Sequence, residues 1–122
     1  MRFRCVLLNA LPLNSFPDEF EEFSIVVRKI SIDYMKRYLE TYCHEVVSFI
    51  RHEATVKVLS EVLETEIKQS SELYRYHSLD SIFVVTLRNP VRGQEKKDIK
   101  AEDLYIFRII AWIYFIFLFF FL

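Results

Sequence analysis

The stretch Val46–Leu63, VVSFIRHEATVKVLSEVL, decides how the chain folds, because it changes from a strand pattern to a helix pattern near its middle. Its first part, Val46–Ile50, is a short apolar run typical of a strand. From Ala54 onward the apolar residues recur at helical spacing, and they form one face opposite a face of Lys, Ser and Glu. Glu53 stands in the first turn, where a negative charge complements the helix dipole. A strand that leads directly into an amphipathic helix favours a sheet with helices packed against it.

The same patterns extend outward from this stretch in both directions. We expect further strands at Phe3–Leu8, Phe23–Lys29, Leu73–His77, Ile82–Leu87 and Leu104–Ile110, and a helix at Ile32–Thr41 that begins after a Ser31 cap. The turn residues Ser78–Ser81 predict that the two strands on either side of them form a hairpin. The resulting order of strands and helices predicts an α+β fold, with a single mixed β-sheet and the helices packed on one face.

The composition suits one compact domain. The chain has 122 residues, of which 52% are hydrophobic and 27% are charged, so it can build a packed core. Its formal net charge of −1 argues against a protein that binds duplex DNA, because such proteins carry a basic surface. An anionic ligand would have to be held by a local site.

The cysteines and histidines give no pattern of a metal site. Cys5 and Cys43 stand in different expected elements and have no CxxC spacing. We expect two reduced, buried thiols, as is typical of an intracellular protein, and a single disulfide between them stays open as the alternative. Neither cysteine stands in a zinc-like pattern with His44, His52 or His77, so we expect no metal.

His52 is the residue best placed for chemistry. It stands just ahead of the expected helix, where unpaired backbone N–H groups and the helix dipole favour a phosphate. An imidazole there can protonate a leaving 5′-oxygen while a ribose 2′-hydroxyl attacks the phosphorus, and this reaction needs no metal. Spacing alone favours the simpler interpretation, in which His52 only caps the helix or lies at the surface.

Two stretches of the chain are similar to motifs of the viral anti-CRISPR ring nucleases of archaeal viruses. Leu8–Asn14, LNALPLN, resembles the Asn-Ala-x-Pro-Leu-Asn loop that follows the opening strand of that family. Ser48–Thr55, SFIRHEAT, resembles its Ser-Ala-Ile-Gly-His-Glu-Ala-Thr segment, in which the histidine is catalytic. A turn at Asp80 and the strand end at Leu87–Arg88 follow in the same order. The resemblance predicts a ring-nuclease-like domain over residues 1–110, followed by an apolar tail at 111–122.

The resemblance implies a function and partners. Proteins of that family pair as homodimers around a two-fold axis, enclose one cyclic tetra-adenylate and cut it to linear di-adenylates without a cofactor. Loss of this messenger switches off the ancillary nucleases of type III CRISPR systems. The resemblance therefore implies action in the host cytoplasm.

The resemblance also assigns site residues. It makes His52 the general acid and Arg88 the residue that stabilises charge on the phosphate. Val91 stands where the family has an acidic residue, and Glu95 is the nearest replacement. The expected ligand contacts are Asn9, Asn14, Arg51, Glu53, Thr55, Ser70 and Ser71. Among them, Arg51 replaces a glycine of the family, and Ser70–Ser71 replace an Asn-Arg pair.

Several of these residues have an alternative role. The asparagines could be turn formers rather than ligand contacts, and Thr55 could satisfy a local carbonyl. The loss of the acidic residue and of the Asn-Arg pair motivates a second hypothesis, a non-catalytic protein that binds a cyclic oligoadenylate or a CRISPR effector.

The end of the chain carries an unusually apolar run, from Ile109 to Leu122. It is shorter than the roughly 20 residues that a membrane-spanning helix needs. Membrane association through residues 109–122, packing against a partner subunit, and an altered reading frame all stay open. The first of these motivates a third hypothesis, a membrane-associated viral structural protein.

Overall fold

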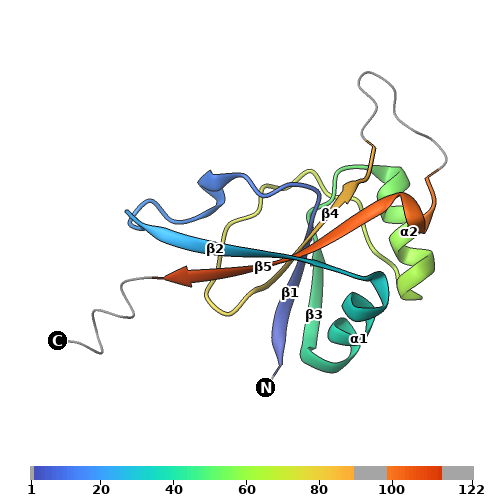
Figure 1. The fold of residues 1–122 in the computed structure, drawn as a ribbon, viewed down its shortest axis with the longest axis horizontal. Helices are drawn as coiled ribbons and strands as arrows, with labels where there is room; N and C mark the ends of the chain where they lie inside the picture. The colour runs from blue at the N-terminus through green and yellow to red at the C-terminus, as the bar shows by residue number, and fades with distance from the viewer. Residues whose placement is uncertain (1, 90–98, 114–122) are drawn as a thin grey trace.

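The computed structural model describes residues 2–89 and 99–113, which form one five-stranded sheet and two α-helices (Figure 1). The strands are β1 (Phe3–Leu8), β2 (Phe23–Ile30), β3 (Cys43–Ser48), β4 (Ser81–Leu87) and β5 (Leu104–Ile113). The helices are α1 (Ile32–Tyr42) and α2 (Glu53–Leu63), with short 3-10 helices η1 (Leu13–Ser15) and η2 (Ala101–Asp103).

The sheet is mixed, as expected. Its strand order is β2-β5-β4-β1-β3. β1 pairs in parallel with β3 on one side and with β4 on the other, whereas β5 runs antiparallel to both β4 and β2. The carboxyl ends of β1, β3 and β4 therefore lie at the same edge of the sheet.

Both helices pack on one face of this sheet, which confirms the expected α+β arrangement. Ser31 caps α1, where its side chain accepts a hydrogen bond from the backbone N–H of Tyr34 at 3.0 Å. The side chains of Met35 on α1 and Leu59 on α2 are fully buried. They share one core with residues of β1, β4 and β5: Cys5, Leu7, Phe83, Val85 and Ile106. No helix within the described ranges is long and apolar enough to cross a bilayer.

The opposite face of the sheet is covered by irregular segments. Tyr74 is buried there against apolar residues of β1 and β4. The expected strand at Leu73–His77 is absent, so the hairpin prediction was wrong. The reason lies in the sheet: β1 and β5 occupy both edges of β4, which leaves no edge for a hairpin partner. The segment is held instead by the η1 loop, because the backbone N–H of Tyr76 donates to the carbonyl of Ser15 at 2.9 Å.

The cysteines also differ from our expectation. Cys5 and Cys43 form a disulfide, with 5.8 Å between their Cα atoms. The parallel pairing of β1 with β3 brings them together, because Phe3 lies opposite Cys43 in the register. The expectation of reduced thiols was based on sequence position, which does not show this pairing.

The last strand is longer than expected. β5 continues to Ile113, so residues 111–113 belong to the sheet, where Ala111 pairs with Ile25 and Trp112 with Ser24. The remaining apolar residues, 114–122, lie outside the described part of the chain.

Candidate functional site at the carboxyl edge of the parallel strands

The parallel strands bring several expected site residues to one edge of the sheet. Asn9 follows β1, the segment Ile50–His52 follows β3, and Arg88 follows β4. In sheets with parallel strands, ligands commonly bind outside the carboxyl ends of those strands. The topology thus places the two stretches that resemble the ring nucleases beside each other.

His52 is the N-cap residue of α2. Its backbone is extended, and its carbonyl accepts the first helical hydrogen bond from the N–H of Val56 at 3.1 Å. The side chain makes no capping hydrogen bond and is exposed. Within residues 2–89 and 99–113, no group hydrogen-bonds to the imidazole. No group of the described residues therefore occupies the two ring nitrogens, and both are available to a ligand.

The segment that carries His52 is held in place from three sides. The backbone N–H of Arg51 donates to Oδ1 of Asn9 at 3.2 Å. Nε2 of Gln69 donates to the carbonyl of Arg51 at 2.6 Å, and the N–H of Ser70 donates to the carbonyl of Ile50 at 2.9 Å. Ile50 is fully buried and anchors the segment in the core. The structure thus assigns Asn9 and Ser70 a role in holding the His52 segment.

Sequence reasoning missed Gln69. A glutamine that follows a helix after several polar residues carries no local pattern that marks it as a support. Its role depends on the return of the chain past α2, which brings residues 67–70 next to the segment before that helix. Ser60 on α2 fixes this return, since its hydroxyl accepts a hydrogen bond from the N–H of Ile67 at 3.0 Å.

The other residues expected to contact the ligand differ in how exposed they are. Arg51, Glu53 and Ser71 are exposed near the start of α2 or on the returning segment. Thr55 is only 4% exposed, because it lies on the buried side of α2, and this does not fit the expected phosphate contact. Asn14 is exposed in η1, where its carbonyl accepts from Nη1 of Arg75 at 3.0 Å.

The remaining two expected catalytic residues differ in how they are placed. Arg88 lies just beyond β4, and its N–H donates to the carbonyl of Asp103 at 2.7 Å. Its guanidinium lies over the ring of Tyr105, 4.4 Å from the ring centroid. In the described part of the chain no hydrogen bond or ion pair links that guanidinium to His52. Glu95 lies outside the described residues.

Asp80 occupies the opposite edge of the sheet. Its carboxylate accepts two hydrogen bonds from the guanidinium of Arg4, at 2.9 and 2.8 Å, and one from the hydroxyl of Tyr74 at 2.7 Å. Burial acts to raise the pKa of Asp80, but the hydrogen bonds from Arg4 and Tyr74 outweigh it and hold that pKa below its ordinary value. Burial, together with the hydrogen bond to Asp80, raises the pKa of Tyr74. This network joins β1 to the start of β4, and it is structural.

Comparison with known proteins identifies the family. The model of the STIV B116-like family matches residues 5–110. The chain belongs to the STIV B116-like family. The fold also matches the solved structure of B116 of Sulfolobus turreted icosahedral virus (STIV), with a TM-score of 0.63 and 14% sequence identity. That match covers 87% of this chain and 97% of B116.

These findings confirm the broader part of the expectation, a protein family of archaeal viruses. At 14% identity, the likeness of this B116-like chain to B116 itself shows the fold alone. A search of curated protein sequences found no match.

Proposed function

We propose that this B116-like protein is a metal-independent ring nuclease that binds cyclic tetra-adenylate and cuts it to linear di-adenylates. Such an activity would inhibit type III CRISPR signalling in the host. The single observation that carries the proposal is the exposed imidazole of His52 at the N-cap of α2, free of any hydrogen bond within the described residues. The resemblance of Leu8–Asn14 and Ser48–Thr55 to the ring nucleases supports it.

The chemistry follows from the position of this imidazole. The 2′-hydroxyl of an adenosine loses its proton to water as its oxygen attacks the adjacent phosphorus, and the bond from phosphorus to the 5′-oxygen breaks. The imidazolium of His52 gives its proton to that departing oxygen, and the product ends in a 2′,3′-cyclic phosphate. The nucleophile belongs to the substrate, so the protein has to supply only the acid, the orientation and the stabilisation of charge.

The start of α2 supplies part of that stabilisation. The first backbone N–H groups of an α-helix have no partner within the helix and point toward an anion at its N-terminus. The hydrogen bonds that join Asn9, Gln69 and Ser70 to the segment before α2 hold that segment, so the imidazole and these amides keep a fixed relation. A rigid arrangement of this kind lowers the barrier because little reorganisation is needed during the reaction.

A homodimer is part of the proposal. A two-fold axis would present two copies of His52 to a ring that has matching symmetry, so that opposite phosphodiesters are cut. Arg88, just beyond the carboxyl end of β4, lies at the same edge of each sheet. It would stabilise phosphate charge after its guanidinium leaves the ring of Tyr105.

A direct assay tests the proposal. We expect purified protein with EDTA to convert labelled cyclic tetra-adenylate to linear products. The substitution His52→Ala should slow this conversion by about 100-fold or more, because a general acid contributes that much. His44→Ala is the matched control, since His44 is exposed on β3 and should leave the rate unchanged. Absence of linear products from the wild-type protein would reject the nuclease proposal.

One observation favours the non-catalytic alternative. The guanidinium of Arg88, the group expected to stabilise charge on the phosphate, lies over the ring of Tyr105, 4.4 Å from its centroid. If the protein binds cyclic tetra-adenylate tightly and leaves the ring intact, it acts as a sponge for the messenger. Binding and cleavage measured on the same sample separate the two functions.

A further inference from the structure

β2 and β5 extend together beyond the part of the sheet that the helices cover (Figure 1). Near α1 their pairing ends with Ile30 opposite Ile106, and both side chains pack in the core with residues of the helices. Because side chains alternate along a strand, Val26 and its partner Ile110 point to the same face of the sheet as this pair. Trp112, two residues further along β5, points there too. We name Val26, Ile110 and Trp112 the β2–β5 patch.

The β2–β5 patch is apolar and open to solvent. Val26 is 42% exposed and Trp112 is 51% exposed, and Ile110 is partly exposed between them. Large apolar side chains that gather on a surface mark a contact with a partner or a membrane. The nine residues that follow β5 in the chain, 114–122, are all aromatic or aliphatic. Beyond the patch, the sequence therefore stays wholly apolar.

Two arginines border the β2–β5 patch. Arg28 and Arg108 are the next pair on the same face, and they lie directly opposite each other in the register. Like charges in this position repel each other. Within residues 2–89 and 99–113, neither arginine forms a salt bridge, and neither β2 nor β5 contains an acidic residue. An anionic partner would relieve this repulsion.

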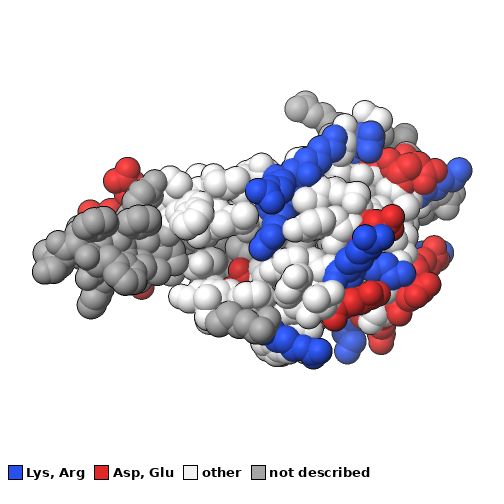
Figure 2. Space-filling model, turned by 60° about the horizontal axis from the view of Figure 1, so that its bottom comes forward, with Lys and Arg blue, Asp and Glu red and all other residues white. Residues whose placement is uncertain are grey.

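The surface as a whole shows a similar division. On one face of the molecule, Lys and Arg side chains form a band across the middle (Figure 2). The described side chains on one side of this band, toward the end where β2 and β5 extend, are mostly uncharged (Figures 1 and 2). The other side of the band carries a mixture of acidic and basic side chains. Apolar surface and basic side chains thus adjoin each other at this end of the molecule.

Tyrosines of α1 hold one of the two arginines in place. Nη2 of Arg108 donates to the hydroxyl of Tyr38 at 3.3 Å, and the guanidinium lies over the Tyr38 ring, 4.6 Å from its centroid. Nη1 of Arg108 lies 3.5 Å from the hydroxyl of Tyr34, which is itself exposed. The border of the patch therefore combines guanidinium groups and a phenol with apolar side chains. Proteins use this combination at the boundary between water and a membrane.

We propose that the β2–β5 patch and its two arginines bind the surface of an anionic lipid bilayer. The apolar side chains enter the boundary between headgroups and acyl chains, and the guanidinium groups bind lipid phosphates. A bilayer of this kind supplies both an apolar layer and a layer of negative charge. A second copy of the chain fits less well, because it would add two more cations to strands without an acidic residue. The site goes beyond the proposed nuclease function, since it does not use His52.

Trp112 is the only tryptophan of the chain, so tryptophan fluorescence reports on the β2–β5 patch itself. We expect the emission of the full chain to shift to shorter wavelength when vesicles of equal parts phosphatidylglycerol and phosphatidylcholine are added. Vesicles of phosphatidylcholine alone should give weaker binding. Brominated acyl chains in the anionic vesicles should quench the emission. Added salt should weaken the binding, because it screens the arginines.

Neighbouring valines on β2 test which face of the sheet meets the lipid. Val26 and Val27 are both exposed, and their side chains point to opposite faces. Val26→Gln should weaken binding to the anionic vesicles at least about threefold, because a valine that leaves water contributes that much. Val27→Gln is the matched control and should bind as the wild type does.

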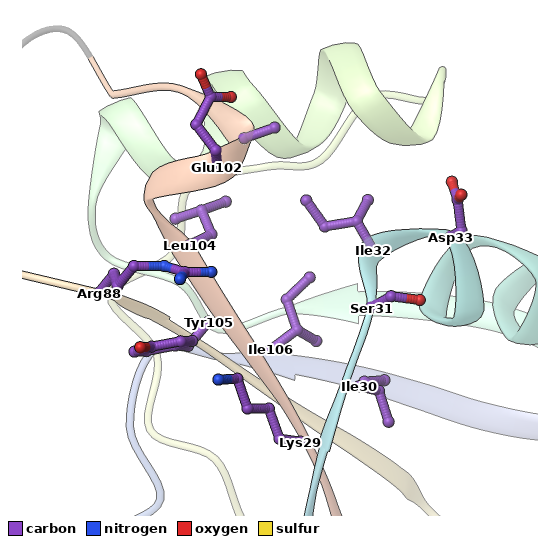
Figure 3. A pocket seen from close by; sticks show the side chains of 11 residues that line it. Lys29, Ile30, Ser31, Ile32, Asp33, Arg88, Glu102, Leu104, Tyr105 and Ile106 are labelled. Carbon is purple, nitrogen blue, oxygen red and sulfur yellow. The ribbon is translucent and has the colours of Figure 1, made fainter.

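A second matched pair tests the charge. Arg28→Glu should weaken binding at least about fivefold, since one cation near an anionic bilayer contributes that much. Lys29→Glu is its control and should weaken binding by less than about twofold, because Lys29 faces away from the bilayer. Figure 3 shows Lys29 extending toward Tyr105 on one side of β2, with Ile30 on the other side.

Several results would overturn the proposal. They are the absence of a shift with anionic vesicles, equal binding to both vesicle types, and equal binding by the two variants of either pair. A shift that appears on raising the protein concentration without vesicles would place a second copy on the patch instead. His52→Ala should bind the vesicles as the wild type does and lose cleavage, so this proposal and the nuclease proposal can fail separately.

Discussion

Oδ1 of Asn9 accepts a hydrogen bond from the backbone N–H of Arg51 at 3.2 Å, which joins the carboxyl end of β1 to the residue before His52. The two residues belong to the two stretches that resemble the ring nucleases. Their contact gives Asn9 a supporting role: it holds the main chain that carries the imidazole. Asn9, a loop residue, thus acts on the site through the backbone of Arg51.

The first prediction concerns this contact. Asn9→Ala should lower the free energy of unfolding by about 1 kcal/mol, because it removes one hydrogen bond from a partly exposed segment. It should also lower the rate of cyclic tetra-adenylate cleavage, since the position of His52 loosens. Asn9→Asp keeps the acceptor oxygen and should retain more of the rate than Asn9→Ala. Equal rates for both variants would contradict the supporting role.

The second prediction concerns the disulfide. It closes a loop with a sequence separation of 38 residues, and the loop-entropy model gives it a stabilisation of about 4 kcal/mol. Denaturant unfolding of the wild type should therefore shift to lower denaturant when a reductant is added. Cys43→Ala should show the lower stability in both conditions, and thiol titration of the unfolded wild type without reductant should find no free cysteine. Free thiols in that sample would show that the bond does not form in solution.

The third prediction is a pH dependence from Asp80. Its pKa in the folded chain is below the ordinary value, so its ionisation stabilises the fold fully above an unfolded pKa of about 3.9. This contribution is lost as the pH falls through the lower folded pKa. The wild type should therefore lose stability in this acidic range. Asp80→Asn should be less stable by about 2 kcal/mol at pH 7, and this difference should shrink as the pH falls. A difference that is constant from pH 7 to pH 2 would contradict the assignment.

The fourth prediction concerns a buried contact between α1 and β4. The hydroxyls of Tyr38 and Ser81 are 2.8 Å apart, and Arg108 stacks on the Tyr38 ring at 4.6 Å. Tyr38→Phe and Ser81→Ala should each cost about 1 kcal/mol of unfolding free energy. The double variant should cost less than the sum of the two, because either substitution already removes the same hydrogen bond. Additive effects would show that the two hydroxyls are not coupled.

Much of the fold could be predicted from local patterns. The helical spacing of apolar residues placed α1 and α2, and the bounds expected for β2 and β4 differ from the structure by a single residue at one end. The prediction failed at Leu73–His77, where aromatic and polar residues alternate from Tyr74 onward as in a strand. That alternation also suits an extended segment with one buried side, so the pattern alone does not distinguish the two.

The candidate site also has a part that local sequence patterns identify and a part that they do not. The motif around His52 and the helix that follows it are local, and the sequence identifies both. The contacts of Gln69 and Asn9 with Arg51 come from segments that are distant in the chain. The same holds for the contacts of Lys29 on β2 and Arg88 beyond β4 with the ring of Tyr105 on β5.

The sequence by itself determined both α-helices, most of the strands and the position of His52 at a helix start, because these depend on the spacing of neighbouring residues. Only the tertiary structure decided the neighbours of each strand. That choice removed the expected hairpin, joined Cys5 to Cys43 and brought Lys29 and Arg88 to one ring. The physical reason is that pairing between distant strands depends on the packing of the whole sheet, which local spacing does not encode.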